Sequence, residues 1–228
     1  MTINSPQFVP RFSGEKRAVE LRGGAMRGLY ASVFKRALDV VAVVLAAPFV
    51  LPLVGAMALA VRRDGGPAFY GQDRVGRHGR TFRMWKLRSM VPDADAVFES
   101  HLNSNPAARV EWDHTQKLRD DPRITPLGRF LRRSSLDELP QLWNVLKGDM
   151  SLVGPRPMMT NQRPLYPGSA YYRLLPGLTG PWQVAGRSET SFAARADFDA
   201  DYERDLSLAT DLRLILRTVA VVLKGTGC

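Results

Sequence analysis

The feature that most constrains this chain is a long apolar segment near its N-terminus. From Ala37 to Val61 the residues are apolar except for Asp39. A helix needs roughly 20 residues to cross the ~30 Å of hydrocarbon in a bilayer, so the segment is long enough to span a membrane. On length alone, a spanning anchor helix is the simplest interpretation.

Two details of the same segment favour a different path. Basic pairs flank both ends, at 35–36 and 62–63, so the positive charge gives no single orientation. Both basic pairs obey the positive-inside rule if the helix enters and leaves the membrane by the same face. Pro48 and Pro52 lie mid-segment, where each removes a backbone donor and bends a helix. The residues alone leave a spanning helix and a bent, re-entrant helix open.

Charge and cysteine content narrow the classes of partner and site. The 228 residues include 32 Lys and Arg against 22 Asp and Glu, a net charge of +10. This excess favours an anionic partner: nucleic acid, anionic lipid or a phosphorylated substrate. The one cysteine, Cys228, excludes an intramolecular disulfide and a multi-cysteine zinc site, and the three histidines show no metal-ligand spacing. Residues 1–34 lack periodicity and are predicted to form a mobile N-terminal tail.

The remaining residues, 64–228, are predicted to form one mixed domain. Short strands are expected at 68–70 and 81–85, joined by a basic loop at 74–80. The expected helices are 94–116 with a break at 103–106, one that starts at Pro126 behind the capping Thr125, 137–147, and 211–224.

The densest cluster of reactive side chains surrounds Asp137 and Glu138. Because proline is tolerated only in the first turn of a helix, Pro140 predicts that both carboxylates lie at a helix N-terminus. Free N–H groups and the helix dipole would keep them ionised there, which suits a nucleophilic Asp137 with Glu138 assisting or holding a metal. An ordinary helix cap is the alternative, and the spacing of Ser135 and Glu138 resembles a capping box.

Other motifs place cations where an anion can bind. Arg156 lies between two prolines, so its backbone is restrained and its guanidinium is presented rigidly to a phosphate. Lys86 and Arg88 are predicted on one face of an extended segment. A plain surface loop and a solvated edge strand explain the same residues. The Gly-rich turn at 176–183 either cradles a base or sugar or only turns the chain.

Taken in order, these segments resemble the bacterial sugar transferase family, the monotopic phosphoglycosyl transferases. The resemblance covers about residues 35–223, and its motifs are Lys35-Arg36 with Asp39, Tyr70 to Gly76, Phe82 to Met90, Asp121 to Thr125, Leu131 to Asn144, Gly148 to Pro157, Pro176 to Gln183, and Asp211 to Thr218. Within the family the chain is most similar to the short enzymes that initiate exopolysaccharide repeat units. It departs from the usual pattern at Pro181 and at Arg204-Asp205.

The resemblance implies an α+β, predominantly helical fold. A re-entrant membrane helix is expected at 35–63, and a cytoplasmic catalytic domain with amphipathic interfacial helices at 64–228. The implied reaction moves a hexose-1-phosphate from a UDP-sugar to undecaprenyl phosphate and releases UMP, as the first membrane step of exopolysaccharide synthesis. The implied location is the inner (cytoplasmic) membrane, with the catalytic domain on the cytoplasmic face and in contact with membrane lipid.

The resemblance also assigns the site residues. Asp137 corresponds to the nucleophile that forms a covalent phosphosugar intermediate, and Glu138 to its partner, tied to Mg²⁺. Asp211 is implied as a further metal residue. The implied phosphate-binding cations are Lys86, Arg88, Arg132 and Arg156.

Two other functions explain part of the sequence. A nucleic-acid-binding protein accounts for the net charge but leaves the apolar segment unexplained, so no nucleic-acid partner is expected. A non-catalytic membrane scaffold of a polysaccharide assembly complex accounts for the segment and the charge, but not for the Asp137–Glu138 pair with a restrained Arg156. The donor sugar, the oligomeric state (a homo-oligomer included) and the role of the tail stay open.

Overall fold

The computed structural model describes residues 28–115, 118–185 and 191–223. This part of the chain is mostly helical with two small two-stranded sheets, in agreement with the expected α+β class. In chain order, with η for 3₁₀ and π turns, the elements are η1 (Tyr30–Phe34), α2 (Lys35–Val61), η2 (Arg62–Asp64), β1 (Phe69–Val75), η3 (Arg77–Gly79), β2 (Thr81–Leu87), α3 (Ala94–Ser104), α4 (Pro106–Thr115), α5 (Pro126–Arg133), η4 (Leu136–Glu138), α6 (Gln141–Lys147), β3 (Ser151–Val153), η5 (Thr160–Leu165), α7 (Ala170–Arg173), β4 (Gly177–Thr179), α8 (Pro181–Ala185), α9 (Arg195–Arg204) and α10 (Leu208–Leu223).

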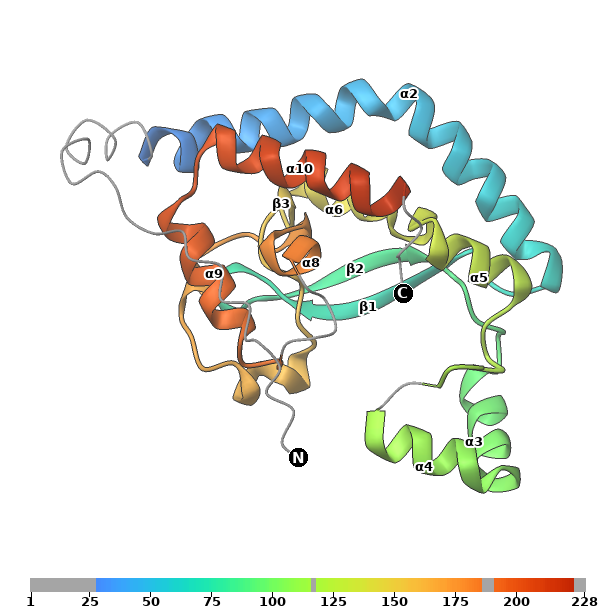
Figure 1. The fold of residues 1–228 in the computed structure, drawn as a ribbon. Coiled ribbons are helices and arrows are strands. Elements are labelled where there is room, and N and C mark those ends of the chain that lie inside the picture. The colour runs from blue at the N-terminus through green and yellow to red at the C-terminus, as the bar shows by residue number, and fades with distance from the viewer. Residues whose placement is uncertain (1–27, 116–117, 186–190, 224–228) are drawn as a thin grey trace.

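The apolar segment forms one long helix, α2, which arches over the rest of the molecule (Figure 1). Pro48 and Pro52 lie inside it, and the ribbon bends in its middle part. Among the described residues, the helical run Tyr30–Asp64 is long and apolar enough to cross a membrane. The run begins upstream of the predicted boundary between tail and helix, because residues 28–34 are already helical; residues 1–27 of the predicted tail lie outside the described residues.

The long helical run packs on the domain at three points along its length. Tyr30, Val43 and Val61 each belong to a different buried cluster, and the rest of each cluster comes from the downstream domain. The start of α2 is also held by polar contacts. Arg36 donates to the main-chain oxygens of Val145 and Leu146, so it satisfies carbonyls at the C-terminal end of α6.

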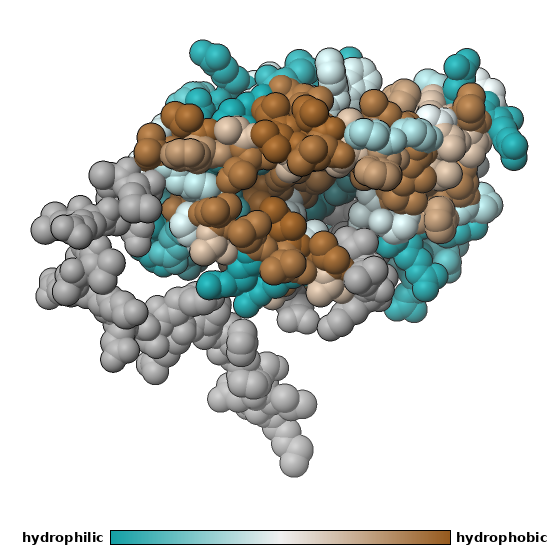
Figure 2. Space-filling view, turned by 90° about the horizontal axis from the view of Figure 1, so that it is seen from above, coloured by the Kyte–Doolittle hydropathy of each residue, from teal (hydrophilic) through white to brown (hydrophobic). Residues whose placement is uncertain are grey.

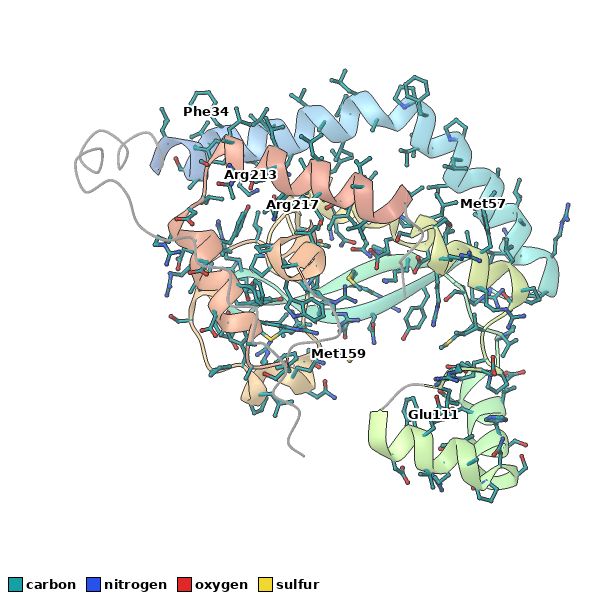
Figure 3. All side chains as sticks on the ribbon, in the orientation of Figure 1. Phe34, Met57, Glu111, Met159, Arg213 and Arg217 are labelled. Carbon is teal, nitrogen blue, oxygen red and sulfur yellow. The ribbon has the colours of Figure 1, made fainter. Side chains whose placement is uncertain are left out.

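The opposite face of α2 is not covered by any of the described residues. Its large exposed apolar side chains are Leu38, Val41, Val44, Leu45, Phe49, Leu51, Leu53 and Leu59. The neighbouring α10 adds Leu208, Leu212, Leu216 and Val219, which recur at helical spacing and form one stripe. Seen from the α2 side, these residues give the molecule a broad apolar surface (Figure 2). Arg213 and Arg217 extend from the same helix α10 (Figure 3).

The two sheets form the centre of the domain. β1 and β2 pair antiparallel from Phe69↔Leu87 to Val75↔Thr81, which confirms both expected strands and extends each of them. Gly79 in the connecting turn has φ 74°, a conformation that glycine adopts without strain. β3 and β4 pair in parallel. Gly154, directly after β3, lies against Gly177 of β4, with no room for a side chain between the two backbones.

The helical hairpin α3–α4 stands apart from the sheets, on the side away from α2, where Glu111 marks α4 (Figure 3). Its two helices and the break between them confirm the expected pattern at 94–116. Phe98 and Trp112 pack edge to face, and the Arg123 guanidinium lies 4.1 Å from the Phe98 ring. Asp121 pairs with Arg123, so the hairpin is fastened to the segment that leads into α5.

Candidate active site

Asp137 and Glu138 lie in the 3₁₀ turn η4, between α5 and α6. Thr125 caps α5 as expected, since its Oγ1 accepts from the Gly128 N–H at 2.9 Å. The predicted helix start at Asp137 is wrong: α6 begins at Gln141, so the two acids precede the helix by one turn. Ser135 makes no side-chain cap and instead adopts a left-handed conformation with φ 57°. A non-glycine residue held in this conformation marks a strained turn, a feature that clusters at functional sites.

The hairpin brings Lys86 to the two acids. Lys86 Nζ lies 2.7 Å from Glu138 Oε1 and 3.5 Å from Asp137 Oδ2. Asp137 is only 6% exposed, whereas the Glu138 side chain is 30% exposed. One cation therefore serves both carboxylates, with the buried acid further from it than the exposed one.

Asn144 fixes β2 against α6, the helix that follows the two acids. Its side chain is fully buried, accepts from the Trp85 N–H at 3.1 Å and donates to the Arg83 carbonyl at 2.8 Å. These are the bonds that a further strand would make along the free edge of β2. Because Trp85 precedes Lys86, this amide sets the position of Lys86 relative to the acids.

The electrostatics of Asp137 oppose ionisation more than the sequence indicates. Burial raises the pKa of Asp137; Lys86 and Arg132 lower it, and the Glu138 carboxylate raises it further, with a net shift upward. The predicted helix N-terminus, which would have held both acids ionised, is not where the acids lie. Positive charge near Asp137 therefore decides whether it is present as a nucleophilic carboxylate.

A small polar pocket opens beside Glu138. It is lined by Arg74, Met84, Lys86, Glu138, Gln141, Arg156, Pro157, Gly177, Leu178 and Gln183. Of the predicted cations, Lys86 and Arg156 line this pocket. Arg74, Gln141 and Gln183 were not singled out as site residues, although all three lie within motifs that carry the resemblance. Trp182 is 7% exposed, and its ring lies 5.6 Å from the guanidinium of the pocket residue Arg156.

The other two predicted cations do not line this pocket. Arg132 Nε donates to Ser89 Oγ at 2.8 Å, and its charge still lowers the pKa of Asp137. Arg88 is 8% exposed, and its partners differ from those of Lys86. Its guanidinium binds the Asp64 carboxylate and the main-chain oxygens of Val61, Pro67 and Met90. In this conformation Arg88 fastens the end of α2 to the hairpin.

Asp211 lies in a separate buried network. Its carboxylate accepts from Tyr30 and Tyr202 at 2.7 and 2.6 Å and pairs with Lys35 at 2.6 Å. Burial and the same carboxylate raise the pKa values of both tyrosines, which keeps them protonated as donors. Within the described residues no group of three or more His, Cys, Asp or Glu side chains is arranged to hold a metal ion.

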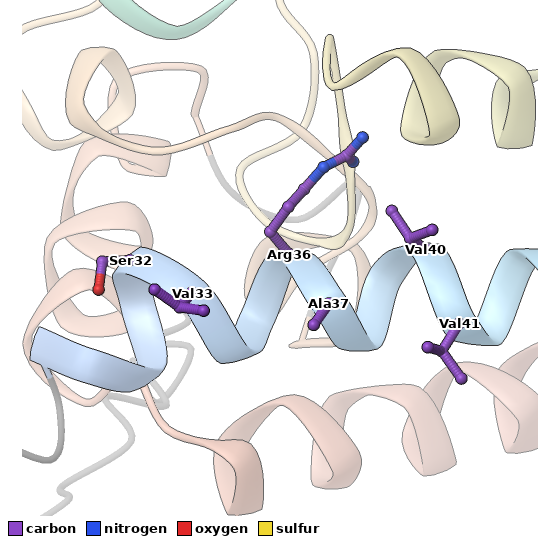
Figure 4. Close-up of a pocket in the computed structure, with 6 residues that line it drawn as sticks. All are labelled: Ser32, Val33, Arg36, Ala37, Val40 and Val41. Atoms are coloured by element: carbon purple, nitrogen blue, oxygen red, sulfur yellow. The ribbon is translucent and has the colours of Figure 1, made fainter.

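A second hollow lies on the first turns of α2 and is mostly apolar. Ser32, Val33, Arg36, Ala37, Val40 and Val41 line it (Figure 4). Arg36 rises from its edge, but its guanidinium is directed to the end of α6. This hollow belongs to the exposed apolar surface and carries no cluster of reactive groups.

Comparison with known proteins decides the family. The family model described as bacterial sugar transferase matches residues 30–225. The chain belongs to the bacterial sugar transferase family. It is 44% identical over 223 residues to the exopolysaccharide production protein ExoY of Sinorhizobium fredii, covering 96% of this chain and 94% of that one.

Two further family members extend the comparison. The chain is 46% identical to the UDP-galactose-lipid carrier transferase of Erwinia amylovora over 85% of this chain, but over only 41% of that longer protein. It is 40% identical to the UDP-glucose:undecaprenyl-phosphate glucose-1-phosphate transferase of Caulobacter vibrioides, over 88% of this chain and 74% of that one. The chain thus spans less than half of the first of these two relatives and most of the second.

Proposed function

We propose that this protein transfers a hexose-1-phosphate from a UDP-sugar to undecaprenyl phosphate, as the first membrane step of exopolysaccharide synthesis. One observation carries the proposal: a buried Asp137 next to Glu138 and Lys86, at a pocket lined by arginines, in a domain with a broad apolar face. The names of the relatives supply the substrate classes, galactose and glucose donors with a lipid carrier among them. The donor hexose of this protein is left open.

The proposed chemistry has two displacements at one phosphorus atom. The Asp137 carboxylate attacks the β-phosphorus of the UDP-sugar, the bond to the bridging oxygen breaks, and UMP leaves with both electrons of that bond. A phosphate oxygen of undecaprenyl phosphate then attacks the same phosphorus and displaces Asp137. A covalent intermediate divides one difficult transfer into two easier steps. Lys86 offsets the charge that builds up when a carboxylate meets a diphosphate.

Of the two predicted metal residues, Glu138 fits a Mg²⁺ ligand and Asp211 does not. Mg²⁺ is usually held by one or two carboxylates together with substrate phosphates and water, so the partly exposed Glu138 is a suitable ligand. Asp211 is occupied by a lysine and two tyrosines, and in this conformation it suits a structural role. When bound, Mg²⁺ would neutralise part of the charge on the diphosphate.

We further propose that α2 is re-entrant, with both ends on the cytoplasmic side. A straight helix that crosses a bilayer separates its ends by the ~30 Å of hydrocarbon. Here the start of α2 is bonded to α6 through Arg36, and its end is bonded to Arg88, next to the hairpin of the same domain. The bend between these anchors turns both ends toward one body (Figure 1). The α10 stripe then lies in the interface beside α2.

The reaction is tested by UMP release. Purified protein with Mg²⁺ and undecaprenyl phosphate is incubated with a panel of UDP-hexoses, alongside Asp137→Asn and the control Asp113→Asn on exposed α4. We expect UMP from one donor, loss in Asp137→Asn, and no loss in Asp113→Asn. UMP release that survives in Asp137→Asn would refute the covalent mechanism. No UMP with any UDP-hexose from a folded protein would favour the scaffold function.

The topology is tested with cysteines placed at either end of α2. Cys228 is replaced by serine, and single cysteines at Ser32 and Gly65 are labelled with a membrane-impermeant maleimide in spheroplasts and in inverted vesicles. A re-entrant helix labels at both positions only in inverted vesicles. Labelling of the two positions from opposite sides would establish a spanning helix.

A further inference from the structure

Three arginines gather in and beside the pocket that Lys86 and Glu138 also line. Arg74 and Arg156 line the pocket itself. Arg195, on α9, lies 4.1 Å from the Trp182 ring, and Arg156 lies 5.6 Å from the same ring. Trp182 is thus the shared wall against which two of the guanidiniums rest.

These arginines differ from Lys86 and Arg88 in having no acidic partner among the described residues. Lys86 is paired with the two acids, and Arg88 is paired with Asp64. Arg74, Arg156 and Arg195 form no ion pair within the part of the chain that the structure describes.

Two of the three also have buried donors without an acceptor. The Nε atoms of Arg74 and Arg195 are buried and make no hydrogen bond to the described residues. Arg74 uses its other nitrogens on Gln72 at 2.5 Å and on the Pro157 carbonyl at 3.3 Å, so the direction of its guanidinium is fixed. A buried guanidinium nitrogen without an acceptor is costly, and such groups call for a ligand.

Mutual repulsion adds to this cost. Burial and then the charge of Arg156 lower the pKa of Arg195 to about 10, and the same two causes lower the pKa of Arg74. Arg195 remains charged at neutral pH, because its pKa stays well above 7. Asp199, one turn along α9, attracts Arg195 without forming an ion pair with it. An anion bound among the three arginines would relieve both the repulsion and the missing hydrogen bonds.

The place of the cluster identifies which anion fits. A diphosphate has two adjacent phosphates, and the proposed reaction puts one of them at Asp137. Lys86, which is paired with the two acids, is placed for the phosphate at Asp137, so the arginines in and beside the same pocket suit the second phosphate. In Figure 1, α9 lies below α2 and α10, beside one end of the β1–β2 hairpin. In the proposed reaction the lipid phosphate would approach from the side of the apolar face of α2, and the water-soluble substrate from a side away from that face.

We infer that Arg74, Arg156 and Arg195 bind the phosphate that stays on the nucleotide, and so hold the departing nucleoside monophosphate. This inference rests on the proposed function for its substrate. Planar guanidiniums bind phosphate oxygens in pairs, which orients the leaving group for in-line attack by Asp137. Arg195 is thereby a substrate-positioning residue that sequence reasoning did not single out.

The test measures UMP affinity without turnover. Binding of UMP to the full-length protein is compared by calorimetry for wild type, Arg74→Met, Arg195→Met, Arg195→Lys and the exposed control Arg109→Met. Loss of a charge-assisted hydrogen bond predicts a decrease of about 10- to 100-fold in UMP affinity for both methionine variants. Arg195→Lys should recover part of the lost UMP affinity, and Arg109→Met should bind UMP as tightly as wild type. The KM for the UDP-sugar should rise by a similar factor, with the KM for undecaprenyl phosphate unchanged.

Different outcomes overturn different parts. Wild-type UMP affinity in both Arg74→Met and Arg195→Met would refute the subsite. A raised KM for undecaprenyl phosphate with unchanged UMP affinity would assign the cluster to the lipid phosphate and refute the inference. If the wild type releases UMP from no donor, the proposed function fails, while the UMP-binding comparison still decides what the arginines hold. Arg74 is held by Gln72 and the Pro157 carbonyl, whereas Arg195 packs on Trp182, so a folding defect confined to Arg195→Met leaves the Arg74→Met measurement decisive.

Discussion

Replacing Asn144 by leucine should destabilise the domain and slow catalysis through Lys86. The two side chains are of similar size, so the change removes hydrogen bonds rather than volume. It leaves the Trp85 N–H and the Arg83 carbonyl, both partly buried against α6, without their partner. Each such group costs about 1–3 kcal/mol, which gives a loss of about 2–6 kcal/mol. For a chain of this size, a central loss of about 4 kcal/mol lowers the unfolding temperature by roughly 8–16 °C.

Tryptophan fluorescence during heating measures this loss in detergent-purified protein. Asn103→Leu is the matched control, because Asn103 is exposed on α3 and the same change there should shift the unfolding temperature very little. UMP release, measured well below the unfolding temperature, should fall in Asn144→Leu because β2 no longer holds Lys86 at a fixed place beside Asp137. An Asn144→Leu protein that unfolds within 2 °C of wild type, taking ~2 °C as the smallest shift expected per kcal/mol, would refute the reasoning.

Three further predictions follow from single residues. Gly128→Ala should lower the unfolding temperature sharply, because a Cβ there would overlap the main-chain oxygen of Ser89; unchanged thermal unfolding would contradict that packing. Burial raises the pKa of Asp199 from 3.8 to about 7, so between these values the unfolded chain loses a proton that the folded protein keeps, and stability falls as pH rises. Heating scans at pH 5 and pH 8 should therefore show a larger loss for wild type than for Asp199→Asn, and parallel losses would count against the shift. Asp211→Asn should lower the unfolding temperature without changing the Mg²⁺ concentration needed for UMP release. Glu138→Gln should raise that Mg²⁺ concentration. The opposite pattern in a Mg²⁺ titration would make Asp211 the ligand.

Local signals in the sequence predicted several of the elements. Proline and glycine positions, the Thr125 cap and apolar periodicity all act over a few residues, and β1, β2 and the helices α3, α4, α5 and α10 were found where they were expected. The short strands β3 and β4 and the helices α7, α8 and α9 were not predicted. The 3₁₀ turn at Asp137 was missed because Pro140 fits the start of a helix as well as a residue just before one. Only the left-handed Ser135 separates the two cases, and serine gives no signal for it.

The composition of the pocket was harder to predict, because the residues that line it come from distant parts of the chain. Lys86 reaches the two acids across a hairpin, and Arg74 meets Arg156 only after β1 packs against the loop that follows β3. Arg88 has the same charge and nearly the same position in sequence as Lys86. It ends in a buried network because β2 stops at Leu87 and the chain turns toward the end of α2. Charge alone does not distinguish a cation that binds substrate from one that joins two elements.

The attachment of Arg36 to the end of α6 has a consequence for where the reaction can occur. Arg36 belongs to the helix with the bare apolar face, and α6 follows Asp137 and Glu138 after a single turn. If α2 lies in the membrane as proposed, its depth of insertion sets the distance of the two acids from the hydrocarbon. The phosphate of a polyprenyl phosphate lies at one depth in the leaflet, and only a carboxylate held at the same depth can take part in its reaction. In this arrangement α2 fixes the level of the two acids relative to the lipid phosphate. A bilayer of different thickness would then separate the acids from that phosphate without changing the contacts among them.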